Sequence, residues 1–265
     1  MIESYWVLLL LGLVLASGVQ LCLWLLQVRT GDATAVDAGW ATTLALLAVL
    51  YAALAAGDLS HRLLIAVAAG SESFRIAWLV AGRIGGEEDP RYRELRGRWR
   101  ERGREQLSFF VFYQAQAVVA WLLAVPFLLV AQNPSSGLEP LEWLGALVWL
   151  GAVAGETVAD RQLARHKADP ANKGRTLRSG LWRYSRHPNY FFQWLTWVAY
   201  ALMALAAPWG WIGILSPLLI LYLILFVTGV PPSEEQALKS RGEDYRRYQR
   251  ETSPFVPWFP RERSA

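Results

Sequence analysis

Residues 5–27 read YWVLLLLGLVLASGVQLCLWLLQ, a run of apolar residues that contains no charged side chain. A helix needs about 20 apolar residues to cross the hydrocarbon core of a bilayer, so this run is long enough to span a membrane. It is too long for the core of a signal peptide, and no basic stretch precedes it. The run therefore predicts a membrane-spanning helix.

Six further segments of low charge follow the first one along the chain. They cover residues 37–58, 63–82, 107–132, 141–155, 190–207 and 211–230. Segment 63–82 is the most polar because it carries Glu72 and Arg75, and segment 141–155 is short unless its helix continues through Leu163. We therefore predict an all-α fold, a polytopic membrane helix bundle of about seven transmembrane helices.

The composition agrees with a membrane protein and excludes several other classes. Of the 265 residues, 54% are hydrophobic and 18% are charged, whereas soluble domains are about 25% charged. This excess of apolar residues excludes an intrinsically disordered chain. The single cysteine, Cys22, excludes an intramolecular disulfide, and the three histidines have no metal-ligand spacing, so we expect no metal site.

The basic residues predict how the spans are oriented. Lysine and arginine concentrate in cytoplasmic loops. In a seven-span arrangement, 24 of the 26 basic residues fall on one side, in the connections 83–106 and 161–186, in the tail after Val230 and at Arg29. We therefore predict a multi-pass membrane protein with its N-terminus outside and its C-terminus in the cytosol; the resemblance described below implies that the membrane is the bacterial inner membrane.

The arginine-rich connection 83–106 contains eight arginines but also six acidic residues. The small net charge argues against a nucleic-acid surface, and we interpret the connection as an amphipathic helix that contacts lipid headgroups.

Polar and aromatic residues crowd the segment between the fifth and sixth predicted spans. Glu156, Asp160 and Lys167 share one face of the predicted helix that leaves the fifth span. At the mouth of the sixth span, residues 182–190 combine arginine, which binds phosphate, with aromatic rings that stack. This pattern predicts a pocket for an anionic, aromatic cofactor such as an adenine dinucleotide or an adenosyl compound. The alternative is an interfacial aromatic belt with positive-inside arginines.

A second polar segment follows the last predicted span. Glu234 and Glu235 come directly after it, followed by Tyr245 and Tyr248, all within reach of the same pocket. The alternative is an ordinary helix start with Ser233 as N-cap. The sequence has no Walker A or G-x-G-x-x-G motif, so a nucleotide would not be held by a Rossmann turn.

Residues 159–257 resemble the C-terminal domain of the steroid 5α-reductase family, most closely its bacterial members of unassigned function. The resemblance rests on ADRQLARHKADPANKGR (159–175), SGLWRYSRHPNYF (179–191), SPLLILYLILFVTGVP (216–231) and GEDYRRYQRETSPFVPWFP (242–260). The R-H-P-N-Y core is also shared with sterol reductases, isoprenylcysteine carboxyl methyltransferases and phospholipid N-methyltransferases. The resemblance therefore implies a membrane-embedded site for NADPH or for S-adenosylmethionine.

Two features are similar to the reductase branch, namely the acidic-to-basic helix with Asp160 and Lys167, and Arg175 ahead of the turn at Gly180. The resemblance implies that twelve residues line the NADPH site. They are Asp160, Lys167, Asn172, Arg175, Trp182, Arg186, His187, Asn189 and Tyr190, with Glu234, Tyr245 and Tyr248 closing the site from the C-terminal side.

The steroid reductases also place a Gln-Glu pair in an early span, and the second predicted span has no such pair. Asp37, at the mouth of that span, and Glu72, in the third span, are the nearest acidic substitutes. A carboxyl group kept protonated by desolvation could donate a hydrogen bond to a substrate carbonyl, so both are candidate catalytic residues. The alternatives are that Asp37 caps a helix and that Glu72 pairs with Arg75.

The resemblance implies an NADPH-dependent reductase of a C=C bond in a lipophilic substrate, such as a steroid or sterol-like molecule or an isoprenoid enone. Within one membrane domain, residues 1–132 would form the substrate side and residues 141–260 the cofactor side. We expect the lipophilic substrate and membrane lipids as partners, and no nucleic acid.

Two alternatives stay open. One is a membrane methyltransferase of lipid or isoprenylcysteine type, in which Glu234 and Glu235 would bind the amino-acid part of S-adenosylmethionine. The other is a non-catalytic membrane scaffold or lipid-binding protein, which the missing Gln-Glu pair allows.

Overall fold

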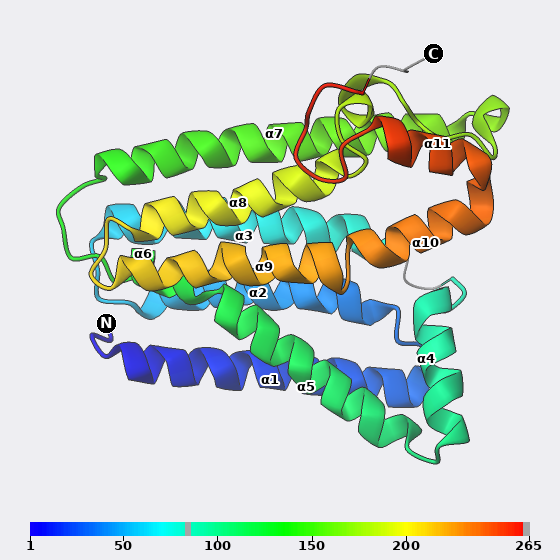
Figure 1. Ribbon diagram of the computed structural model, residues 1–265. Coiled ribbons are helices and arrows are strands. Elements are labelled where there is room, and N and C mark those ends of the chain that lie inside the picture. The colour runs from blue at the N-terminus through cyan, green and yellow to red at the C-terminus, as the bar shows by residue number, and fades with distance from the viewer. Residues whose placement is uncertain (83–85, 262–265) are drawn as a thin grey trace. The chain divides into compact units, whose positions relative to one another are not determined.

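The computed structural model describes residues 1–82 and 86–261, and helices dominate this part of the chain (Figure 1). The helices are α1 (Tyr5–Thr30), α2 (Ala35–Leu54), α3 (Leu59–Ala81), α4 (Pro90–Glu101), α5 (Glu105–Leu123), α6 (Val125–Ala131), α7 (Pro140–Ala168), α8 (Pro188–Ala204), α9 (Leu215–Phe226), α10 (Val230–Arg241) and α11 (Glu243–Glu251). Short 3-10 helices are η1 (Pro170–Asn172), η2 (Gly180–Arg183) and η3 (Gly210–Ile214). The predicted all-α, polytopic membrane fold is confirmed.

Within the described residues, five helical stretches are long and apolar enough to cross a membrane. They are Tyr5–Thr30, Ala35–Leu54, Glu105–Ala131, Pro140–Ala168 and Gly210–Arg241. The other two predicted spans also form helices, but α3 carries Arg62, Glu72 and Arg75, and α8 has 17 residues. By length and composition the structure therefore supports five spans where the sequence predicted about seven. The predicted orientation stays a prediction.

Two local expectations about the helices are confirmed, and a third needs a correction. The connection 83–106 contains the helix α4, and α7 continues beyond Leu163 as far as Ala168. The segment 107–132 forms one candidate span, Glu105–Ala131, as predicted, and the correction is that its helix is interrupted between α5 and α6. The interruption falls beside Pro126, which has no N–H for the helical hydrogen-bond ladder.

The chain divides into two compact units. Unit 1 comprises residues 1–142 and 203–216, and unit 2 comprises residues 143–202 and 217–265. The boundary near residue 142 lies close to the division expected between the four early and three late spans, although residues 203–216 join unit 1.

Unit 1 is built around close contacts between α1, α2 and α5 (Figure 1). A Cβ atom at Gly12 of α1 would lie 2.1 Å from the hydroxyl oxygen of Tyr51 in α2, so only glycine permits this approach. Farther along the same pair of helices, the side-chain amide of Gln20 donates to the hydroxyl of Thr43 at 3.3 Å. The indole N–H of Trp121 in α5 donates to the carbonyl of Leu9 at 2.8 Å.

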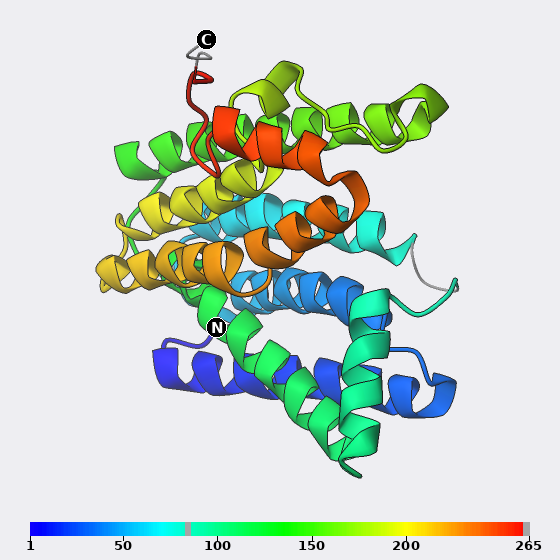
Figure 2. The same ribbon diagram turned by 45° about the vertical axis from the view of Figure 1, so that its right-hand side comes forward.

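Unit 2 contains α10 and α11 and most of α7, α8 and α9. A Cβ atom at Gly155 of α7 would lie 2.4 Å from the ring of Phe192 in α8, which shows how closely these helices pack. α10 and α11 follow each other through a turn at Gly242, where φ is +52° (Figure 2).

The C-terminal tail of unit 2 packs along residues 184–187. The backbone N–H of Arg186 donates to the carbonyl of Ser253 at 2.9 Å, and the hydroxyl of Ser185 donates to the carbonyl of Phe255 at 2.7 Å. The tail therefore fixes the backbone of the segment that carries the R-H-P-N-Y sequence.

Candidate functional site

The carboxylate of Glu234 in α10 is the centre of a partly buried polar cluster in unit 2. Its Oε1 atom accepts from the guanidinium Nε of Arg186 at 2.7 Å, from the imidazole Nε2 of His187 at 3.2 Å and from the hydroxyl of Tyr245 at 3.4 Å. Its Oε2 atom accepts from the side-chain amide of Gln249 at 2.9 Å. Glu234 is thus held as a carboxylate by four donors. We call these five residues the Glu234 cluster.

Arg186 ties the Glu234 cluster to the end of α11. Its Nη1 group donates to the carbonyls of Gln249 at 2.9 Å and Thr252 at 3.0 Å, and its side chain is only 11% exposed. Arg186 and Glu234 are both largely shielded from solvent and are neutral as a pair, so removing either partner leaves an uncompensated charge.

The start of α8 extends this network. The imidazole of His187 stacks on the ring of Tyr190, with centroids 5.5 Å apart and an interplanar angle of 8°. The hydroxyls of Tyr190 and Ser233 lie 3.0 Å apart. His187 and Tyr190 are three residues apart across the first turn of α8, and this spacing brings the two rings together.

Asn189 and Asp160, which the sequence predicts to line the site, contact each other. The side-chain amide of Asn189 in α8 donates to Oδ1 of Asp160 in α7 at 3.1 Å. The Oδ1 atom of Asn189 is buried and has no hydrogen-bond donor among the described residues. A buried acceptor without a partner is costly, so this atom marks a place where a ligand N–H would be stabilised.

Trp182 and Tyr248, which are predicted to line the cofactor site, use their polar atoms for structural contacts, and their role toward a cofactor stays a prediction. The indole N–H of Trp182 donates to the carbonyl of Ala159 at 3.0 Å, and both side chains are buried. The hydroxyl of Tyr248 donates to the carbonyls of Trp182 and of Ser185, the latter at 3.0 Å. Burial raises the pKa of Tyr248 above its ordinary value. Both aromatic residues hold the η2 segment in place.

The three remaining predicted residues lie at the end of α7 and in the turn after it. The side-chain amide of Asn172 donates to the carbonyl of His166 at 3.3 Å and to Asp169 at 3.2 Å, so it stabilises the turn. Lys167 and Arg175 have exposed side chains. No contact among the described residues joins these three to the Glu234 cluster.

The segment 161–183 carries a surplus of positive charge. Six of its cations are exposed and have no acidic partner among the residues that the structure describes: Arg161, Arg165, Lys167, Lys173, Arg175 and Arg183. In contrast, Arg178 is bound, since its Nη2 group donates to Oδ1 of Asp244 at 2.8 Å.

The structure adds residues that the sequence did not single out. Gln249 belongs to the Glu234 cluster, and a signal was present because it lies four residues after Tyr245 on the same face of α11. Asp244 accepts from the backbone N–H of Thr176 at 2.7 Å and from Arg178. Burial alone would raise the pKa of Asp244, but the hydrogen bonds from Thr176 and the charge of Arg178 outweigh it and lower that pKa. No sequence pattern indicated this contact.

Asp37 in unit 1 contacts the helix α4. Its Oδ2 atom accepts from the guanidinium of Arg91 at 2.9 Å, and its Oδ1 atom accepts from the hydroxyl of Tyr92. Asp37 does not cap α2, because the N-cap position is Thr34 and Asp37 lies within the first turn. It instead fastens α4 to the start of that helix.

Glu72 in α3 is paired with Arg75, as the alternative interpretation proposed. Its two carboxylate oxygens accept from Arg75 at 2.9 Å and 2.7 Å. A catalytic donor role for Asp37 or Glu72 stays a prediction.

The fold and its helix lengths define a multi-pass integral membrane protein. The chain belongs to the family described as "Protein of unknown function (DUF1295)", whose model matches residues 23–252. This match covers most of both units. No curated protein and no solved structure matches the chain significantly.

Proposed function

We propose that this membrane protein is an NADPH-dependent reductase of a C=C bond in a lipophilic substrate, such as a steroid or sterol-like molecule or an isoprenoid enone. The starting point is the resemblance of residues 159–257 to the steroid 5α-reductase family. The observation that carries the proposal is the positive charge of residues 161–183, which no acidic residue in the described part of the chain compensates. The Glu234 carboxylate of the same unit already has four donors of its own.

The sign of this charge favours NADPH over S-adenosylmethionine. NADPH carries a diphosphate and a 2′-phosphate, so it is strongly anionic, whereas S-adenosylmethionine carries a sulfonium and an ammonium group. Arginine and lysine are the residues that bind phosphate. The unpaired cations Lys167, Lys173 and Arg175 are therefore suited to the phosphates of NADPH.

The contacts of the two glutamates argue in the same direction. A methyltransferase of this superfamily would need Glu234 and Glu235 to bind the amino-acid part of its cofactor. Glu234 is committed to Arg186 and three further donors, and Glu235 lies 2.6 Å from the ammonium group of Lys239. An additional ammonium group would have to displace these donors, which makes the methyltransferase the weaker proposal.

Asn189 provides a test of fit for the cofactor. Its buried Oδ1 atom lacks a donor among the described residues, and both the carboxamide and the adenine of NADPH offer N–H groups. When bound, NADPH supplies a hydride. Asp160 would then hold the Asn189 amide in the orientation that presents Oδ1, and the Glu234 cluster would keep the first turn of α8 in position.

Reduction of an enone also needs a hydrogen-bond donor to its oxygen as charge develops there. Asp37 and Glu72 remain the candidates for this role. Each must first leave its arginine partner and take up a proton, because a carboxylate paired with arginine has no proton to donate. The donor step is therefore expected to be sensitive to substitution of Arg91 or Arg75.

Binding of cofactors to the purified protein in detergent tests the proposal. Calorimetric titrations with NADPH, NADH and S-adenosylmethionine are expected to show the tightest binding for NADPH. The double variant Lys173→Gln and Arg175→Gln is expected to weaken NADPH binding by about a hundredfold or more, since each of the two charge-assisted contacts contributes about 1.5–3 kcal/mol and about 1.4 kcal/mol is tenfold.

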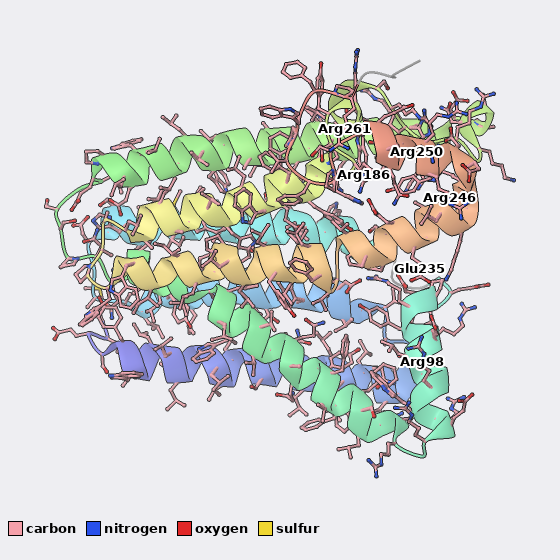
Figure 3. The ribbon with its side chains drawn as sticks, viewed as in Figure 1. Arg98, Arg186, Glu235, Arg246, Arg250 and Arg261 are labelled. Carbon is pink, nitrogen blue, oxygen red and sulfur yellow. The ribbon has the colours of Figure 1, made fainter. Side chains whose placement is uncertain are left out.

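The matched control is Arg246→Gln, which removes an exposed arginine of the same unit that is paired with Glu243 at 2.7 Å (Figure 3). This control should bind NADPH like the wild type. Binding of S-adenosylmethionine without binding of NADPH would overturn the proposal.

A further inference from the structure

The corner between α4 and α5 in unit 1 contains a hollow that the proposed reductase does not use. Its volume is about 420 Å³, and its lining residues are Arg100, Gly103, Arg104, Glu105, Gln106 and Leu107. The hollow lies at the first residues of the membrane-spanning stretch Glu105–Ala131. Such a position is at the depth of the lipid headgroups, where hydrocarbon gives way to the polar interface.

The backbone of this corner is held by buried contacts rather than by exposed side chains alone. Arg96 is buried, its guanidinium binds Glu88 at 2.7 Å and Glu105 at 2.6 Å, and it lies 4.7 Å from the ring centroid of Phe109. The ring of Trp99 packs edge-on against Phe109 at 4.8 Å. The corner therefore presents its arginines from a fixed framework.

The same framework continues into the turn that lines the hollow. The backbone N–H of Arg104 donates to the carbonyl of Trp99 at 3.0 Å, and Gly103 has a φ of +65°, which glycine adopts readily. Figures 1 and 2 show α4 lying across the end of α1 and leading into the start of α5.

The charge of the hollow is positive. Its one acidic residue, Glu105, is already compensated by Arg96 and by Arg100, whose Nε lies 2.8 Å from the carboxylate. Arg104 is exposed and has no acidic partner in the described part of the chain. The start of α5 also has no side-chain cap, so backbone N–H groups add to the positive potential.

An apolar stripe begins in the hollow and runs along α5. Leu107 is 62% exposed, and Val111, Val118 and Leu122 are exposed as well. Their spacing of 4, 11 and 15 residues from Leu107 places all four on one face of the helix. A ligand that fills the hollow can therefore continue along an apolar helix face.

We infer that this corner binds one anionic glycerophospholipid. Arg104, together with the free donors of Arg100, would bind the headgroup phosphate, and the acyl chains would lie along Leu107, Val111 and Val118. The apolar stripe is the reason for choosing a lipid over free phosphate, because inorganic phosphate gains nothing from it. The inference does not depend on the proposed reductase function.

Native mass spectrometry of the delipidated protein in detergent tests this inference. Titration with phosphatidylglycerol is expected to give one retained lipid, with clearly weaker retention of zwitterionic phosphatidylcholine and no competition from equimolar inorganic phosphate. Arg104→Gln is expected to lower the affinity for phosphatidylglycerol by about fivefold, the effect of about 1 kcal/mol per basic residue near a lipid headgroup.

The matched control is Arg98→Gln. Arg98 is an exposed arginine of the neighbouring helix α4 that pairs with Glu94 outside the hollow (Figure 3). It should retain phosphatidylglycerol like the wild type. Equal retention of both lipids, or equal losses for Arg98→Gln and Arg104→Gln, would overturn the inference. Effective competition by inorganic phosphate would do so too, because it would indicate a site for free anions.

Discussion

Each unit contains an arginine that joins different elements, but the units differ in the balance of charge around it. Arg96 binds two carboxylates, whereas Arg186 binds one carboxylate and two backbone carbonyls. In unit 1, Arg96 binds Glu88 and Glu105, and Arg91 binds Asp37 and Asp89. In unit 2, the Glu234 cluster is compensated, but the adjacent segment 161–183 has cations without acidic partners.

The presence or absence of acidic partners distinguishes arginines and lysines that hold helices together from those that are available to bind a ligand. A network in which each cation has its carboxylate fastens helices together and leaves little charge for a ligand. A surplus of one sign is unfavourable for the isolated protein, and an anionic ligand would relieve it. By this criterion residues 161–183 and Arg104 are the ligand-binding candidates, whereas Arg91 and Arg96 are structural.

The strongest test of the structural side is Arg186→Ala. This change leaves the partly buried Glu234 carboxylate without its main cation, and the free energy of unfolding is expected to fall by about 3 kcal/mol, the lower end for a buried ion pair. Thermal unfolding in detergent measures the effect, with the exposed Arg246→Ala as control. An unchanged melting temperature for Arg186→Ala would show that the Glu234 cluster does not stabilise unit 2.

Arg96→Gln is expected to have a smaller effect in unit 1, about 2 kcal/mol. After the substitution Glu105 keeps Arg100 as a partner, and Glu88 keeps the backbone N–H of Ala33 at 3.0 Å and can accept a hydrogen bond from the new glutamine. Glu234 keeps no arginine after loss of Arg186, and alanine cannot donate to it. The comparison uses the same thermal unfolding assay for both variants. A loss larger than that of Arg186→Ala would reverse the ranking of the two networks.

Asp244 gives a pH-dependent prediction. The pKa of Asp244 is lower in the folded than in the unfolded protein. The ionised carboxylate therefore stabilises the fold fully above the pKa of the unfolded state, and this stabilisation is lost as the pH falls through the pKa of the folded state. Wild-type stability should therefore decline more steeply on acidification than that of Asp244→Asn. Melting temperatures from pH 7 down to pH 3 measure this, and parallel curves would contradict it.

The smallest expected effect on stability is that of removing the surplus cations. Lys173→Gln with Arg175→Gln should change the free energy of unfolding by less than about 0.5 kcal/mol, because both side chains are exposed and lack acidic partners. The same variant should lose NADPH affinity. A large loss of stability would show that these cations have a structural role.

Much of the fold was predictable because a membrane helix carries its signal in its own composition. The long apolar runs of α1, α2 and α5 need only length and hydropathy to be recognised, and the helix of α7 was correctly extended past its apolar part. The break between α5 and α6 was not predicted, since proline is tolerated within many membrane helices and only the packing determines whether the helix continues.

The site was predictable in part. The prediction from the sequence that Glu234 lies near Arg186 and His187 is correct, although Glu234 follows them by 48 and 47 positions in the chain. It assigned Trp182 and Tyr248 to ligand contacts, but their polar atoms bond to backbone carbonyls. A residue type shows which bonds a side chain is able to make, and only the fold shows which partner is near.

The sequence by itself determined the class of protein, because apolar runs of membrane length cannot be buried in any other way and because the basic residues gather in a few connections. The tertiary structure decided which charged side chains pair with each other and which remain available to a ligand. That depends on contacts between distant segments, such as Arg178 with Asp244 and Arg96 with Glu88 and Glu105. Charge compensation acts over a few ångströms in space, and the distance along the chain does not reveal it.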